Sequence, residues 1–166
     1  MRFGRWLNSA EKNIIANVRN HGCHINIVSP SEDEEGVPFA YSVGFAETVG
    51  QPEVIVFGLP GNVLGSVINE TLQRCREGLE LQDGAEVHGV LEGHKLIARQ
   101  VQPDFIVPDY LNSAIWYQQY RTGRALEHVV QLVWPGPDDG LFPWDDVSDE
   151  SVRHFQPALY QPSLHQ

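Results

Sequence analysis

The sequence predicts a single α+β domain with a mostly antiparallel sheet, and three observations carry that prediction. Apolar runs with a period of two alternate with runs at helical spacing along the 166 residues. The connections between the first three expected strands are too short for crossover helices, which favours antiparallel pairing. No repeat or linker interrupts the chain, so we expect one domain over 1–166. The pattern leaves open whether the sheet closes into a barrel.

Three helices are expected. The first covers 9–20, with Ser9 as its N-cap and Gly22 at its end. The second covers 62–77, where apolar residues recur at helical spacing, and a shorter one covers 110–121. The N-terminal helix lies within 1–20, and an irregular tail is expected over 146–166.

Six strands are expected at 23–28, 39–45, 53–59, in a hairpin over 85–101 that turns at 92–93, and at 128–134. In the first strand, "CHINIV", Ile25 and Ile27 share one face while His24 and Asn26 share the other. The third strand is apolar on both faces, which predicts a central position.

The composition argues against several classes of binding partner. The net charge is −11 and the basic residues are scattered, so nucleic acid and anionic membranes are poor partners. The two cysteines, Cys23 and Cys75, form no disulfide framework, and no apolar run resembles a signal peptide or a membrane span. We therefore expect a cytoplasmic protein.

Small residues in the strand over 39–45 suggest a pocket. If Ala40, Ser42 and Gly44 share a face with His24 and Asn26, space is left beside hydrogen-bonding groups, and a small molecule would fit there. The alternative is that a helix packs closely on the small residues. A shift of the strand register by one residue would exchange the faces.

Several residues are candidates for a role in this pocket. His24 lies mid-strand near Ser42 and Tyr41, so His24 and Tyr41 are the catalytic candidates, with His24 as a general base. Candidate ligand-binding residues are Asn26, Ser42, Gly44, Arg99 and Gln131. No zinc-binding pattern occurs among the histidines, so no metal site is predicted.

A second function class stays open. Acidic residues concentrate at 31–35 and 138–150, which is compatible with a non-catalytic module that binds a basic protein. A homodimer also stays open, as does the question of whether the pocket turns over a substrate.

The blocks "HGCHINIV", "PFAYSVGF", "GQPEVIVFGLP" and "QLVWPGPDDGLFPWD" resemble, in this order, those of the bacterial family named domain of unknown function 4262. The likeness runs from about 21 to 145. Gln51 stands where that family usually has a histidine, and His94 where an aromatic residue is common. The resemblance implies candidate positions but no established activity; these are His24, Tyr41, Glu53, Gln131, Trp134 and Asp145. Trp134 is thereby a further candidate ligand-binding residue.

A weaker similarity links the strand order to the flavin reductase-like split barrels, which bind flavin mononucleotide between subunits. It implies flavin as a cofactor. The basic residues that usually meet the flavin phosphate do not cluster in this sequence.

Overall fold

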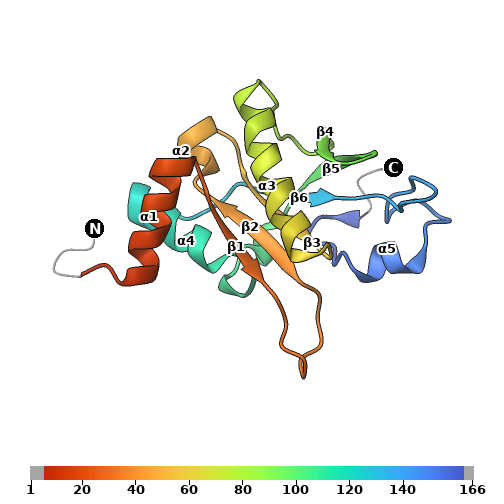
Figure 1. Ribbon diagram of the computed structural model, residues 1–166, viewed down its shortest axis with the longest axis horizontal. Coiled ribbons are helices and arrows are strands. Elements are labelled where there is room, and N and C mark those ends of the chain that lie inside the picture. Colours follow the sequence, from red (N-terminus) through yellow and green to blue (C-terminus); the bar gives the residue numbers. More distant parts are fainter. Residues whose placement is uncertain (1–5, 163–166) are drawn as a thin grey trace.

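The computed structural model describes residues 6–162 and shows one six-stranded sheet with helices on both faces (Figure 1). The strands are β1 (His24–Val28), β2 (Phe39–Val43), β3 (Glu53–Phe57), β4 (Glu86–Leu91), β5 (His94–Gln100) and β6 (Val129–Val133). The helices are α1 (Ser9–His21), α2 (Phe45–Val49), α3 (Gly61–Arg76), α4 (Pro108–Thr122) and α5 (Glu150–His154), with a short 3₁₀ turn at Pro103–Phe105.

The strand order is β1-β2-β3-β6-β5-β4. All neighbours are antiparallel except β3 and β6, which are parallel. The α+β class and the mostly antiparallel sheet are therefore confirmed. The sheet is open, because β1 and β4 form its two ends and do not pair with each other.

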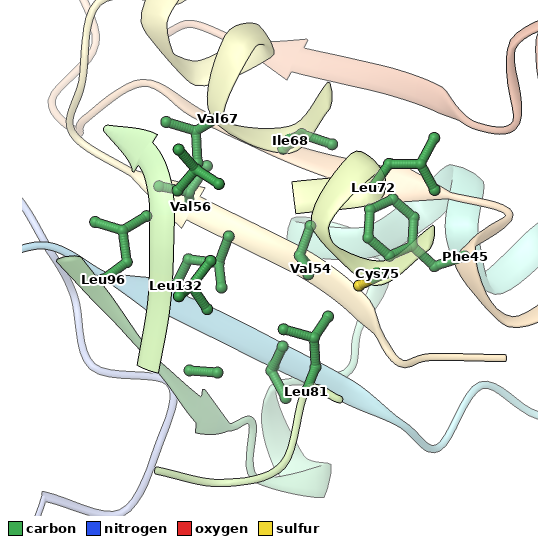
Figure 2. Close-up of a cluster of buried hydrophobic side chains, with 14 of the residues drawn as sticks. Phe45, Val54, Val56, Val67, Ile68, Leu72, Cys75, Leu81, Leu96 and Leu132 are labelled. Carbon is green, nitrogen blue, oxygen red and sulfur yellow. The ribbon is translucent and has the colours of Figure 1, made fainter. Parts of the chain in front are cut away.

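One face of the sheet is covered by α3. Its buried side chains Leu64, Val67, Ile68 and Leu72 pack on the central strands, as Figure 2 shows for the last three. The amphipathic spacing that predicted this helix thus describes its buried stripe. Burial of aliphatic side chains on this scale is the main favourable contribution to folding.

The opposite face is covered by α1 and α4. Ile14 and Val18 of α1 and Leu111 of α4 pack with Tyr41, Val43 and Ile55 of the sheet. Asn8, not Ser9, is the N-cap of α1: its side chain accepts from the Glu11 N–H at 2.8 Å, and the Glu11 carboxylate accepts from the Asn8 N–H at 3.1 Å. This reciprocal capping box fixes the start of the helix.

Two short helices were not predicted. The prediction of three helices is wrong because α2 and α5, with five residues each, are too short to show a helical period. The helix α5 lies within the tail that was expected to be irregular. Residues 1–5 and 163–166 of the predicted terminal segments lie outside the described residues.

The second strand ends earlier than expected. It stops at Val43, because Gly44 has a φ of 106° and becomes the N-cap of α2. Phe45 therefore belongs to a helix and not to the strand. An ideal Cβ on Gly44 would lie 2.8 Å from Cγ1 of Val18, so glycine is required by both conformation and space.

The register of β1 on β2 corrects the predicted faces. Asn26 is opposite Tyr41 and Ile27 is opposite Ala40, so Ala40 and Ser42 share the face of Ile25 and Ile27. Ala40 belongs to the same hydrophobic cluster as the buried side chains of α3, and Ile25 packs against this cluster, so α3 covers that face. The predicted combination of His24 and Asn26 with the small residues is wrong, and the alternative, close packing of a helix, is what the structure shows.

Replacement of Gly44 by alanine is expected to lower the free energy of unfolding by about 2–4 kcal/mol. A positive φ costs an L-residue about 1–2 kcal/mol, and the contact with Val18 adds overpacking strain. Gly50→Ala is the matched control: Gly50 also has a positive φ, 67°, but nothing lies within 4 Å of its Cβ position. Urea unfolding of both variants measures the difference, and equal losses would contradict the close approach of Val18.

Candidate functional site

A buried carboxyl group, that of Glu53, lies where β3 begins. The Glu53 side chain points to the end of β2, where its Oε1 accepts from the Ser42 hydroxyl at 2.6 Å and its Oε2 accepts from the Gly44 N–H at 2.7 Å. The Phe45 N–H lies 3.2 Å from both oxygens. Two of the donors are thus backbone groups at the start of α2, a favourable position for a negative charge.

Burial dominates the acidity of this group. Desolvation raises the pKa of the Glu53 carboxyl to about 7, against the hydrogen bonds from Ser42, Gly44 and Phe45 and the charge of Arg121, which lower it. The protonated and ionised forms are therefore both populated near neutral pH. A carboxyl with this pKa is able to give or take a proton at physiological pH.

A cavity of about 420 Å³ adjoins this part of the molecule. Its walls come from α2, the turn into β3, the C-terminal part of α4 and the segment that leads to β6. The lining residues are Ala46, Gly50, Gln51, Pro52, Glu53, Gln118, Arg124, Ala125, Leu126, Glu127 and His128. The cavity brings together residues that lie far apart in the sequence, and no motif or spacing pointed to Arg124 or His128.

The walls of this cavity are tied to one another. The backbone N–H of Glu53 donates to the carbonyl of His128 at 3.2 Å. Tyr117 of α4 donates its hydroxyl hydrogen to Glu47 of α2, and Arg121 lies 3.8 Å from the same carboxylate. Gln51 accepts from the Leu81 N–H at 2.7 Å. The cavity is therefore formed by fixed elements, which reduces the ordering cost of binding.

His24, Asn26 and Tyr41 lie together, on the face opposite α3. Asn26 Nδ2 donates to the Tyr41 hydroxyl at 2.6 Å and to the Ser113 hydroxyl at 2.7 Å, while Asn26 Oδ1 lies 2.8 Å from His24 Nε2. Asn17 Nδ2 lies 2.9 Å from His24 Nδ1. With Asn26 Oδ1 as acceptor and Asn17 Nδ2 as donor, His24 donates through Nε2 and accepts at Nδ1.

Two members of this network were missed from the sequence. Asn17 lies on α1 and Ser113 on α4, and the Ser113 N–H also donates to Tyr41, at 2.9 Å. Neither residue belongs to a motif, and the packing of both helices on one face of the sheet brings Asn17 to His24 and Ser113 to Asn26. Their contribution could not be read from spacing along the chain.

The other candidate residues lie on the far side of the sheet's centre. Arg99 is 3% exposed; its Nε bonds to Asp83 at 3.1 Å and its guanidinium lies 5.0 Å from the Trp144 ring and 4.7 Å from the Tyr160 ring. Gln131 Nε2 donates to the Pro157 carbonyl, and its Oε1 accepts from the Leu159 N–H, both at 2.9 Å. The structure thus separates these residues from His24 and Asn26.

Trp134 and Asp145 hold chain segments in place. Trp134 Nε1 donates to the Phe57 carbonyl at 2.7 Å, and the Trp134 N–H donates to Gln156 at 2.9 Å. Asp145 accepts from the Phe142 N–H at 2.8 Å. His94 lines a second, more open cavity of about 620 Å³ beside α3 and the β4–β5 hairpin.

Within residues 6–162, no three histidine, cysteine, aspartate or glutamate side chains gather in a way that could hold a metal ion. None of the helices over the same residues combines the length and apolar character needed to cross a membrane.

The fold and site define a class of protein: one open, mixed sheet between two layers of helices, with a buried glutamate at the break between β2 and α2. The chain matches the family model of Domain of unknown function (DUF4262) over residues 17–149, and it belongs to that family. No curated protein and no solved structure matches it. The analogy with flavin reductase-like split barrels gains no support, and the sheet is not closed.

The Glu53→Gln variant is expected to change how stability depends on pH. Because folding raises the pKa of Glu53 from an ordinary 4.5 to about 7, the folded state holds this proton more tightly than the unfolded state. The resulting stabilisation is complete below about pH 4.5 and is lost as the pH rises through 7. Between about pH 4.5 and 7, the free energy of unfolding of the wild type should therefore fall by up to about 3 kcal/mol relative to that of the variant.

Denaturant unfolding at several pH values measures this effect. Glu92→Gln is the control, since Glu92 is exposed in the β4–β5 turn and its replacement should leave the pH profile unchanged. Parallel pH profiles for the wild type and the Glu53 variant would show that Glu53 does not titrate in this range.

Proposed function

We propose that this protein binds a small molecule in the cavity between α2, the start of β3 and residues 124–128. The observation that carries the proposal is a cavity of about 420 Å³ whose lining includes the buried Glu53. Ligand pockets typically measure about 300–1,000 Å³ and combine apolar walls with a few fixed polar groups. Residues with strongly shifted pKa values also concentrate at functional sites.

The lining supports a ligand with an anionic group. Arg124 offers a planar guanidinium, which suits a carboxylate or phosphate, and it has no ion-pair partner among residues 6–162. His128 adds a second nitrogen donor, and Leu126 and Pro52 supply apolar surface. Glu127 would meet a hydroxyl or amino group of the ligand, while Glu53, whose carboxylate is held by Ser42 and Gly44, would keep the adjoining wall in place. We therefore expect a small polar metabolite with at least one acidic group.

This proposal moves the pocket away from the face of the strands at 23–28 and 39–45. Ser42 and Gly44 act through Glu53, whose carboxylate they hold. His24, Asn26 and Tyr41 satisfy one another's hydrogen-bonding groups, which favours a structural role for them. Cys23 and Cys75 are free and buried, which supports our proposal of a reducing, cytoplasmic environment.

The alternative function, an acidic module that binds a basic protein, rests on the net charge of −11. In Figure 1 the loop over 31–35 projects from the β1–β2 hairpin, while 138–150 lies near α5, so the view gives no support for one shared acidic face. The cavity remains the better-supported functional feature.

Fragment screening by nuclear magnetic resonance tests the proposal. In ¹⁵N-labelled wild type, small aromatic and aliphatic carboxylic acids are expected to shift the amide signals of Gly50, Arg124 and His128. Ala46→Trp places an indole at the cavity wall and should abolish these shifts. Ala16→Trp is the matched control, because Ala16 is also exposed on a helix but lies outside the cavity lining.

Arg124→Gln separates the charge from the shape of the site. Loss of the guanidinium should weaken carboxylate fragments by about tenfold, as expected for one charge-assisted hydrogen-bonding group. The matching primary amides should bind the wild type and the variant equally. Binding of the acids that is unaffected by both Ala46→Trp and Arg124→Gln would overturn the proposed site.

A further inference from the structure

The two ends of the sheet differ in how they are protected. At one end, β4 has a register shift between Val87 and Leu91, a positive φ of 79° at Gly89, and exposed polar side chains at Glu86 and His88. Bulges and charges of this kind are devices by which proteins prevent an edge strand from pairing with another chain.

The edge strand β1 has none of these devices. All five of its residues pair with β2 in one continuous register, and its sequence, HINIV, contains no lysine, acid, proline or glycine. Ile27 is 50% exposed and Val28 is 40% exposed. A regular strand with exposed β-branched residues is well suited to accept a further strand.

We propose that β1 pairs with β1 of a second copy of this chain, antiparallel and around a two-fold axis, so that one sheet continues through a homodimer. Centring the pair on Asn26, the middle residue of β1, uses the whole strand. Ile25 then lies opposite the partner's Ile27, and the reverse, on the face that α3 covers. Such isologous contacts are the commonest kind in soluble homo-oligomers.

The charges at the two ends of β1 favour a second copy over any other strand. The exposed acids Glu32, Asp33 and Glu35 follow β1, while the exposed Arg19 precedes it in the last turn of α1. Figure 1 shows the loop after β1 and the end of α1 at opposite ends of the strand. An antiparallel partner reverses this order, so each acidic loop lies beside the partner's Arg19.

One residue from each end of β1 serves to test this arrangement. Arg19 is exposed in the last turn of α1, and Asp33 is exposed in the loop after β1. In a dimer centred on Asn26, the two-fold axis brings the loop of each copy to the end of the strand where the partner's α1 ends, so this opposition of charge occurs twice. Two exposed pairs of this kind contribute modestly but measurably to association.

Sedimentation velocity over a range of protein concentrations tests this inference. The wild type is expected to form a dimer, and Arg19→Asp and Asp33→Arg should each raise its dissociation constant by about tenfold. The double variant, with both charges exchanged, should return to within about threefold of the wild type. Circular dichroism confirms that each variant is folded, and Ile27→Lys should abolish the dimer through the strand itself.

A matched control separates this pair from the overall charge. Asp33→Arg changes the net charge from −11 to −9, which by itself would reduce repulsion between copies. Glu92→Arg makes the same change in the β4–β5 turn and should not weaken the dimer. The inference is overturned if the wild type is a monomer up to about 100 µM, or if Asp33→Arg strengthens association as Glu92→Arg does.

This inference is independent of the proposed ligand site. The cavity lies at α2 and residues 124–128, and none of its lining residues belongs to β1. If the protein is monomeric but still binds carboxylic acids, only the proposed dimer is contradicted. If it is a dimer that binds no fragments, only the proposed function is contradicted.

Discussion

The carboxylate of Glu53 is the group on which the arrangement around the cavity depends. Through its side chain it holds the Ser42 hydroxyl and the backbone at Gly44, where β2 ends and α2 begins. Through its backbone N–H it is joined to His128, at the entry to β6. One residue thus connects two walls of the cavity to the centre of the sheet.

The state of this carboxylate follows from two opposed effects. Burial disfavours the ionised form, while the hydroxyl of Ser42 and the N–H groups at the start of α2 favour it. Burial has the larger effect on the pKa of Glu53, and the hydrogen bonds offset part of it. The pKa therefore lies near neutral pH and not far above neutral. Replacement by an apolar side chain would leave Gly44 and Ser42 without their acceptor, so the group cannot be removed without a cost to the turn.

Much of the fold could be predicted from the sequence, because the long elements have clear periods. The stripe on α3 and the apolar run of β3 identified their elements and their central positions. The register of β1 on β2 was predicted wrongly. The apolar face of β1 could pair beside either the large or the small residues of β2, and in the structure it lies with Ala40 under α3. The helix α2 was missed because it depends on Gly44 and Glu53, which interact across nine positions of sequence.

The predicted site residues fall into two groups, according to whether the structure brings them together. His24, Asn26 and Tyr41 lie together, but through a register other than the predicted one. The prediction put Tyr41 on the face opposite His24 and Asn26, whereas the observed pairing of Asn26 with Tyr41 places the three on one face. Arg99, Gln131 and Trp134 were polar or amphipathic residues in strands or at their ends, and the partners they found lie in the C-terminal segment and in neighbouring loops. Sequence showed that these groups needed partners, but their identity depends on how the tail crosses the sheet.

The Asn26 network also bears on the edge of the sheet. Because Asn26 is bonded to Tyr41, Ser113 and His24, the middle of β1 is held from one face as well as by the ladder to β2. A strand that is already extended and immobile has little conformational entropy left to lose when a further strand pairs with it. The polar cluster that was first considered for catalysis therefore gives β1 the rigidity that an edge needs if it is to recognise a partner through its backbone.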